Sequence, residues 1–398
     1  MTAETPRRSR FRQFYEKYSF TLWVLVFVAA SMAYPAAFRM WFGTDLKILI
    51  VPLIQIITFG VGTTLSGRDF KNVLTIPWPV LIGVVLQFTV MPFVGYGIAM
   101  TFGFPAEVAA GIILIGSVSS GVASNVMTYL AGGNVPLSVT ITSMTTLISP
   151  VVTPFWMKTL AGRLIPVPFV GMMLSIFNMI IIPIFAGLIA HRLLYGSKPW
   201  ERRKALWWAA AGIALLALAA GILQIPARFW GAFIVLKSGL ALGFILLGLT
   251  ILAKLIIAVW LKGPERWMDK TLPLISMASI CLIIAVITAQ SRDQLLTVGP
   301  LLILAAVIHN ATGYSLGYWG ARLARLNEAA CRAVAMEVGM QNGGMASGIA
   351  IDVLKSTSAA LAPAIFGPWM NISGSLLAGW WRRRPVPGTE SVRVEEKP

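Results

Sequence analysis

Apolar residues in this chain gather into long runs that short polar or Pro/Gly-rich breaks separate. Most runs are close to 20 residues long, the length that an α-helix needs to cross the hydrocarbon core of a bilayer. The pattern therefore predicts an all-α polytopic membrane protein with about twelve transmembrane helices. The predicted spans lie near residues 20–38, 45–64, 76–102, 106–131, 135–157, 166–190, 205–224, 232–261, 272–289, 296–320, 328–351 and 358–381.

The charged residues give these spans an orientation. The chain is 57% apolar and 12% charged, and 23 of its 32 Lys and Arg residues fall in alternate loops and the two tails. The loops on the basic side contain Arg68–Lys71, Arg192–Lys204, Lys262–Lys270 and Arg322–Arg332. Short loops rich in Lys and Arg remain in the cytoplasm. We therefore expect both termini to be cytoplasmic, and we attribute the net charge of +17 to membrane topology rather than to nucleic-acid binding.

Small and polar residues interrupt two of the predicted spans at similar depth. In the span near 106–131 they run from Ser117 to Asn125, and in the span near 328–351 from Glu337 to Gly344. A span with a buried amide precedes each interrupted span, and a span with central hydroxyl or amide groups follows it. The second three-span unit starts seven spans after the first, so the two units run in opposite directions. This pattern predicts an inverted repeat with two broken helices, as in many secondary transporters.

Glu337 is the one acidic residue well inside a predicted span. A charge near the bilayer centre costs about 2.5–3.5 kcal/mol, and neither interrupted segment offers a Lys or Arg to offset it. The remaining partners are a bound cation or a proton. Neutral oxygen donors surround Glu337 in the sequence, and such donors select hard ions such as sodium. Where the helix unwinds, backbone carbonyls can bind the ion, and the N-terminus of the following half-helix can face an anion.

Two other functions are compatible with parts of this pattern. A proton-coupled exporter would use Glu337 as a titrating group and would not need the surrounding oxygen donors. An intramembrane enzyme would need paired acids, a metal cluster or a nucleophile with its base, and the predicted spans contain none of these, so we expect no enzymatic activity. The isolated amides Gln55 and Asn178 are interpreted as hydrogen-bonding groups between helices, and His309 as a packed polar residue.

Four segments resemble the bile acid:sodium symporter family. The two signature regions are SGVASNVMTYLAGGNVPLSVTITSMTTLISPVVTP and EVGMQNGGMASG, and HNATGY and WMNISGSLLAG are also similar to the family. The resemblance implies a bacterial inner-membrane transporter with ten spans, divided into a core of two crossed broken-helix units and a panel. It places the core at 76–157 and 296–381, the panel at 20–64 and 166–289, and cytoplasmic tails at 1–19 and 382–398.

The same resemblance implies two sodium ions as the coupling ions, together with a substrate site. The residues implied for the first ion are Ser124, Asn125, Ser138, Thr142 and Glu337. Those implied for the second are Gln87, Glu337, Val338, Met340 and Gln341, with Val338 and Met340 acting through their backbone carbonyls. The residues implied for the substrate are Val122, Ala123, Asn125, Asn342, Met370 and Asn371.

The chain departs from the family pattern in two places. Val122 and Met370 stand where bacterial members often have Thr and His, so the substrate floor is less polar. Residues 200–265 add two spans, and because they carry no polar residue for a site, we expect them to pack on the panel, away from the crossing. The expected function is alternating-access symport of sodium with a small organic anion, either a pantoate-like or other short carboxylate or a bile-acid-like amphipath. The expected partners are this anion and the lipid bilayer, and the sequence predicts no oligomeric state.

Overall fold

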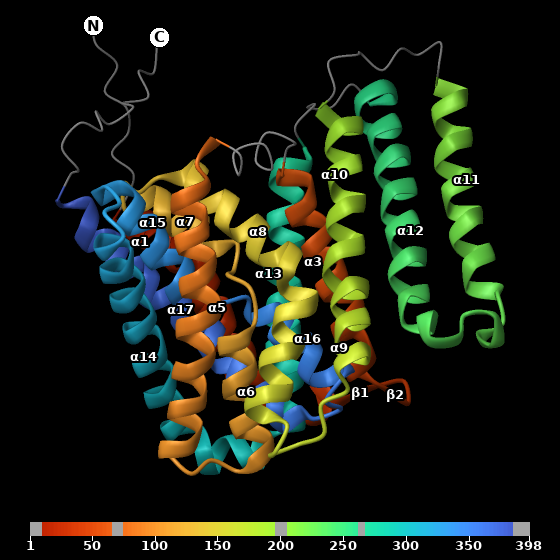
Figure 1. Ribbon diagram of the computed structural model, residues 1–398. Coiled ribbons are helices and arrows are strands. Elements are labelled where there is room, and N and C mark those ends of the chain that lie inside the picture. Colours follow the sequence, from red (N-terminus) through yellow and green to blue (C-terminus); the bar gives the residue numbers. More distant parts are fainter. Residues whose placement is uncertain (1–9, 66–74, 196–204, 262–266, 385–398) are drawn as a thin grey trace, which may run out of the picture.

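The computed structural model describes residues 10–65, 75–195, 205–261 and 267–384, and this part of the chain is almost entirely helical. Figure 1 shows long helices running side by side across one thickness of the molecule. The long helices are α1 (Arg10–Ala33), α3 (Ile50–Thr64), α5 (Pro77–Thr101), α8 (Val135–Trp156), α10 (Ile182–Tyr195), α11 (Ala205–Gln224), α12 (Leu236–Lys254), α13 (Met268–Gln290), α14 (Arg292–Leu323) and α17 (Thr357–Arg382). The shorter ones are α2 (Ala36–Arg39), α6 (Ala106–Ser117), α7 (Ala123–Leu130), α9 (Phe169–Ile176), α15 (Glu328–Gly339) and α16 (Gly343–Asp352).

Brief segments extend or join these helices. They are the two-residue strands β1 (Met40–Trp41) and β2 (Thr44–Asp45), the 3-10 turns η1 (Leu46–Leu49), η5 (Ala227–Phe229) and η6 (Gly231–Val235), and the wider π-type turns η2 (Met157–Ala161), η3 (Phe177–Ile181) and η7 (Leu255–Trp260). Each predicted span coincides with a helix, with a helix plus such a turn, or with a pair of half-helices. Eight helical segments of the described residues are long and apolar enough to cross a membrane. The protein is therefore a multi-pass membrane protein, while the total of twelve crossings stays a prediction.

The two breaks predicted in the sequence are present. Helix α6 ends at Ser117 and α7 begins at Ala123, while α15 ends at Gly339 and α16 begins at Gly343. The extended segments between the half-helices cross each other, with a backbone hydrogen bond from Asn342 N to Ser119 O (2.8 Å) and another from Gly121 N to Met340 O (2.8 Å). These bonds satisfy backbone groups that each break releases from its helix.

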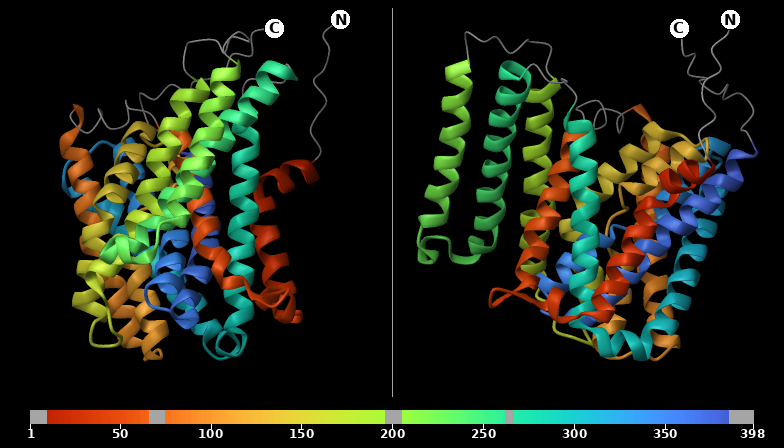
Figure 2. Two further views of the ribbon diagram at one scale, coloured as in Figure 1. Left: turned by 90° about the vertical axis from the view of Figure 1, so that its right-hand side faces the viewer. Right: turned by 180° about the vertical axis from the view of Figure 1, so that it is seen from behind.

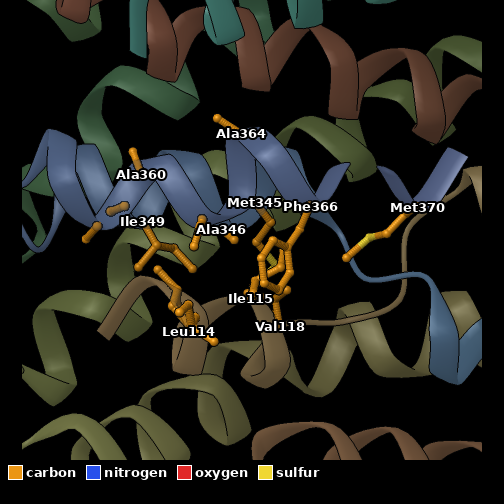
Figure 3. Packing of buried hydrophobic residues seen from close by; sticks show 14 of the residues in the cluster. Leu114, Ile115, Val118, Met345, Ala346, Ile349, Ala360, Ala364, Phe366 and Met370 are labelled. Carbon is orange, nitrogen blue, oxygen red and sulfur yellow. The ribbon is translucent and has the colours of Figure 1, made fainter. Parts of the chain in front are cut away.

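The half-helices α6 and α16 form the centre of the largest apolar core. Figure 3 shows Leu114, Ile115 and Val118 facing Met345, Ala346 and Ile349, with Phe366 of α17 packed beside them and Ala360 and Ala364 on the opposite side of α17. All of these side chains are buried. Gly111 lets α6 approach α17 closely, because a Cβ at this position would run into the backbone of Ala359. Dense packing thus holds the two helix breaks in place, and a densely packed core transmits small displacements of one helix to its neighbours.

The helix pair α11–α12 lies at one edge of the molecule, beyond α10 (Figures 1 and 2). Helix α11 packs on α12, and α12 packs on α10 and α3, two helices of the predicted panel. The pair makes a polar contact with η3 at Ser238. Its hydroxyl accepts a hydrogen bond from Asn178 Nδ2 (3.0 Å), and the neighbouring Gly239 N donates to Asn178 Oδ1 (2.6 Å).

The same contacts confirm the roles predicted for the two isolated amides. Gln55 Nε2 donates to the backbone oxygen of Asn178 (3.0 Å), so the two residues join α3, η3 and α12. The structure describes only part of the loops that are predicted to be cytoplasmic. Arg68 and Lys71, much of Arg192–Lys204 and Lys262–Lys270, and residues 1–9 and 385–398 of the two tails lie outside the described residues. The division into core and panel and the orientation of the termini stay predictions.

Candidate ion and substrate site at the helix crossing

Glu337 lies in α15, less than one turn before the break, and its side chain is fully buried. Four hydroxyl groups surround its carboxylate. Ser124 and Ser138 donate to Oε1 (2.5 Å each), and Ser120 (2.6 Å) and Thr142 (2.7 Å) donate to Oε2. Charge-assisted hydrogen bonds of this kind are stronger than neutral ones. The carboxylate is therefore fixed in position before any ligand arrives.

These hydroxyls come from three segments that the crossing brings together. Ser120 lies in the extended segment before α7, Ser124 in the first turn of α7, and Ser138 and Thr142 on one face of α8, because residues four apart align in a helix. Asn134 sets the start of α8 by accepting a hydrogen bond from Leu137 N (3.0 Å). A cap of this kind fixes the first turn and so the position of Ser138 over the carboxylate.

Oxygen atoms outnumber the protons available to them in this cluster. Ser138 Oγ lies 2.8 Å from Asn125 Oδ1 and 3.1 Å from Thr128 Oγ1, besides its contact with Glu337, yet a hydroxyl has one proton to donate. Thr142 Oγ1 is also close to Asn125 Oδ1, at 3.2 Å. The ion pairs formed by the described residues do not include Glu337. A buried carboxylate among neutral oxygens without a basic partner is an arrangement that a hard cation satisfies.

Two residues predicted for a second ion, Gln87 and Gln341, donate hydrogen bonds to backbone carbonyls next to the two breaks. Gln87 Nε2 donates to Val118 O (3.0 Å), and Gln341 Nε2 donates to Val338 O (2.5 Å). The side-chain oxygens of both glutamines are buried and form no hydrogen bond within the described part of the chain. Buried acceptors without a partner are rare in folded proteins and call for an explanation. The carbonyl of Met340 is already used, because it accepts from Gly121 N.

A cavity of about 190 Å³ lies beside the crossing, between the broken helices and helices α3 and α13. Five of the six residues predicted for the substrate line it, namely Val122, Ala123, Asn342, Met370 and Asn371. The sixth, Asn125, belongs to the oxygen cluster instead. The N-terminal ends of α7 and α16 both meet this cavity, and Asn342 caps α16 by accepting from Met345 N (3.0 Å). Helix N-termini carry a partial positive charge that favours anions.

Comparison with known proteins identifies the family. The sequence pattern described as the Sodium Bile acid symporter family matches residues 51–229. The sodium-dependent transporter YocS of Bacillus subtilis, named as uncharacterized, is 33% identical over 92% of this chain and 91% of its own length. The chain belongs to the sodium bile acid symporter family. The sodium/metabolite cotransporter BASS2 of rice (Oryza sativa subsp. japonica), named as probable and chloroplastic, is 26% identical over 95% of this chain and 73% of its own length.

One solved structure extends the likeness at the level of the fold. The sodium proton antiporter MjNhaP1 of Methanocaldococcus jannaschii superposes with a TM-score of 0.51, at 14% sequence identity, over 94% of both chains. Membership of the sodium bile acid symporter family makes this protein a transporter of a sodium-dependent class. Two relatives of the chain that contains this oxygen cluster and central cavity are named for sodium-dependent transport or cotransport.

Sequence reasoning missed several groups at this family member's site. Ser120 contacts Glu337 directly, and its hydroxyl lies 3.1 Å from Thr145 Oγ1. The polar stretch from Ser117 to Asn125 contained the signal for Ser120, but spacing alone does not show which serine of an unwound segment faces inward. Asn310, in the span before the second interrupted one, is buried, and its Nδ2 donates to the backbone oxygen of Gly339 (2.6 Å), the last residue of α15.

Arg332 was assigned to a basic loop and is instead 4% exposed within α15. Its guanidinium donates to Glu328 Oε1 (2.9 Å) and to the backbone oxygens of Ala131 (2.8 Å), Trp381 (3.3 Å) and Arg384 (2.7 Å). It therefore ties the end of α7 and the end of α17 to the half-helix that carries Glu337. The sequence concealed this role because Arg332 stands only four residues into a span, where a basic side chain ordinarily reaches the surface.

Proposed function

We propose that the protein is a secondary active transporter that couples sodium entry to uptake of a small organic anion. The observation that carries the proposal is the buried Glu337 carboxylate, held by four hydroxyls and without a basic partner among the described residues. Sodium would bind Glu337 with Ser124, Asn125, Ser138 and Thr142, and Ser120 is added to this set. A second sodium would bind the orphan oxygens of Gln87 and Gln341 with the carbonyls that flank the break.

The ion cluster and the substrate cavity share the same short segments. Asn125 contacts the oxygen cluster, and Val122 and Ala123 at the start of its half-helix line the cavity. On the other chain segment, Gln341 supplies an orphan oxygen, and Asn342 beside it lines the cavity. Sodium binding would therefore order the two half-helix N-termini that receive the anion. A site preorganised in this way binds its ligand with less loss of conformational freedom.

The cavity supports a short carboxylate rather than a bile-acid-like amphipath. Its volume of about 190 Å³ lies below the range of about 300–1,000 Å³ typical of sites for larger ligands. Two half-helix N-termini and the amides of Asn342 and Asn371 offer donors for a carboxylate. Val122 and Met370 offer an apolar floor, which suits a branched, pantoate-like hydroxy acid.

We further propose that transport occurs by rocking of the core against the panel in the bacterial inner membrane, with both termini in the cytoplasm. The support is the placement of the central cavity, which lies between α3 and α13 of the predicted panel and α16 and α17 of the predicted core. A rigid-body movement between these groups would open the cavity to one side at a time.

Sodium-dependent thermal stabilisation tests this proposal. Purified protein is titrated with sodium chloride, with potassium chloride as the ionic-strength control, for the parent and for Glu337→Gln. We expect sodium to raise the melting temperature of the parent only, because a ligand that binds the folded state stabilises it. A panel of short carboxylates, pantoate included, should add stabilisation only when sodium is present.

Two outcomes would contradict the proposal. Equal stabilisation of parent and Glu337→Gln by sodium would remove Glu337 from the ion site. A melting temperature that ignores sodium but shifts with pH, with the shift lost in Glu337→Gln, would instead identify the proton-coupled exporter, for which the hydroxyl shell is dispensable.

A further inference from the structure

Exposed arginines gather at the end of the molecule where α14 and α17 both end. Figure 2 shows these two helices side by side in the view from behind, and they pack on each other. The rings of Tyr318 and Trp381 join their ends, stacked with 5.8 Å between centroids. The exposed arginines are Arg322 in the last turn of α14, Arg325 in the turn that follows, and Arg382, Arg383 and Arg384 at the end of α17. We call these five residues the arginine surface.

The charge of the arginine surface is not neutralised by acidic side chains. Within the described part of the chain, four of the five arginines form no ion pair. The fifth, Arg322, lies 3.7 Å from Glu328 Oε2, beyond hydrogen-bond distance. Glu328 already accepts hydrogen bonds from Arg332 Nε (2.9 Å) and from the Tyr318 hydroxyl (2.6 Å). Its charge is offset by the buried Arg332, so the exposed guanidinium groups keep their positive charge.

Exposed tryptophans place the arginine surface at the boundary of the membrane. Trp319 on α14 is 62% exposed and Trp380 on α17 is 49% exposed. Trp78, exposed at the start of α5, donates to a backbone oxygen of the turn after α14 (3.3 Å). Tryptophan is enriched where the hydrocarbon core meets the headgroups. Arg322 and Arg384 follow Trp319 and Trp380 by three and four residues, about one helical turn, which places them at the level of the headgroups.

The backbone that carries the last arginine is held in place. The buried guanidinium of Arg332 donates to the backbone oxygens of Trp381 (3.3 Å) and Arg384 (2.7 Å). The guanidinium of Arg384 lies 4.2 Å from the ring centroid of Trp380, a cation–π contact. A surface that is ordered before its ligand arrives loses less conformational freedom on binding.

The residue type indicates which chemical group fits this surface. Basic residues of both kinds accumulate on the cytoplasmic side of membrane proteins, but all five residues here are arginine. The planar guanidinium group binds phosphate oxygens through two parallel hydrogen bonds, which an ammonium group cannot do. A phospholipid headgroup carries such a phosphate at this level of the bilayer, and clusters of four to eight basic residues beside a transmembrane helix bind anionic lipids. Leu316 and Leu376, both exposed one turn before the two tryptophans, offer apolar contacts to the acyl chains.

We propose that the arginine surface binds an anionic phospholipid of the adjoining leaflet. Its headgroup phosphate lies at the ends of α14 and α17, and its acyl chains run past Trp319 and Trp380 toward Leu316 and Leu376. The bound lipid braces the two helix ends that Arg332 joins to α15. The proposal depends neither on the transported anion nor on the coupling ion.

A lipid titration of the purified full chain in detergent micelles tests the proposal. The melting temperature is followed at constant ionic strength as anionic phosphatidylglycerol or zwitterionic phosphatidylcholine is added, and glycerol 3-phosphate serves as a soluble phosphate without acyl chains. The test variant is Arg382→Gln/Arg383→Gln. The matched control, Lys158→Gln/Arg163→Gln, also removes two exposed positive charges, but at the other end of α8.

We expect phosphatidylglycerol to raise the melting temperature of the parent and of the control alike, and phosphatidylcholine to raise it less. Each arginine at an anionic surface contributes a factor of about five, so the test variant should need about 25-fold more phosphatidylglycerol for half-maximal stabilisation. Arg325→Asn is a second measurement in case the double variant does not fold, because Asn tolerates the left-handed backbone at this position (φ 63°). It should need about five-fold more phosphatidylglycerol than the parent.

Three results would overturn the proposal. Equal responses of the parent to the two lipids would remove the preference for an anionic headgroup. A loss in the control as large as that in the arginine variants, or no loss in those variants, would remove the arginine surface as the site. Stabilisation by glycerol 3-phosphate as strong as that by phosphatidylglycerol would identify a site for soluble phosphate in place of a lipid.

Discussion

Removal of the Ser138 hydroxyl should weaken sodium binding strongly, while removal of a neighbouring serine hydroxyl should not. Ser138 Oγ lies 2.5 Å from Glu337 Oε1 and 2.8 Å from Asn125 Oδ1, so Ser138→Ala deletes a group shared by two of the proposed ion ligands. Ser143 lies on the same helix and is also buried, and among the described residues its hydroxyl donates only to Val139 O (2.8 Å) within its own helix. Ser143→Ala is therefore the matched control.

The expected size of the effect follows from the charge of Glu337. A hydrogen bond to a charged group contributes about 1.5–3 kcal/mol. Since about 1.4 kcal/mol corresponds to a factor of ten, loss of this group should raise the sodium concentration at half-saturation by roughly 10- to 100-fold. Ser143→Ala should change it by less than about two-fold, because its hydroxyl contacts no proposed ligand.

The assay is a sodium titration of each purified variant, followed by the melting temperature at constant ionic strength. Comparison at constant ionic strength matters because general screening by salt affects all variants alike. An unchanged half-saturation in Ser138→Ala would refute the assignment of this cluster as a sodium site. Equal losses in Ser138→Ala and Ser143→Ala would show that the effect is a general weakening of α8.

A further prediction concerns a residue outside the ion cluster. Arg332→Gln should lower the free energy of unfolding by about 3 kcal/mol, because it leaves Glu328 and three carbonyls without their buried cation. Arg332→Lys should not restore the stability, since one ammonium group cannot reproduce the planar fork of the guanidinium. Denaturant unfolding in detergent measures both variants, and an Arg332→Gln as stable as the parent would refute the role of Arg332 in joining α7, α15 and α17.

Sequence patterns sufficed for the fold wherever a single helix decided the outcome. Run length located α5, α8 and α13 within a few residues, and the small polar stretches located both breaks. Glu337 was found because a lone acid in an apolar span has few explanations. The resemblance to the family then supplied most of the residues that the structure gathers around it.

The parts that sequence missed depend on packing between segments far apart in the chain. Ser120 faces Glu337 only because the two extended segments cross, and no local spacing encodes that crossing. Arg332 is buried because the ends of α7 and α17 offer it carbonyl oxygens, a contact over 201 residues in the case of Ala131. In the sequence, Ser238 is a polar residue in an apolar run, and only the structure shows that Asn178 donates a hydrogen bond to its hydroxyl. In each case a polar side chain took its role from partners that periodicity does not reveal.

The crossing itself provides the most demanding prediction, because it alters no proposed ligand. A Cβ on Gly121 would lie 2.8 Å from Gln341 O, closer than a real Cβ contact, and the backbone bond from Gly121 N to Met340 O leaves little freedom to move away. Overpacking of this kind costs about 1–3 kcal/mol and is relieved by displacement. Gly121→Ala should therefore push the two breaks apart and weaken sodium binding, although every hydroxyl and amide remains. Gly97→Ala, where a Cβ has no neighbour within 4 Å, is the control. If Gly121→Ala bound sodium as the parent does, the spacing of the two breaks would not govern the ion site, and the coupling between ions and substrate would have to act through a different part of the fold.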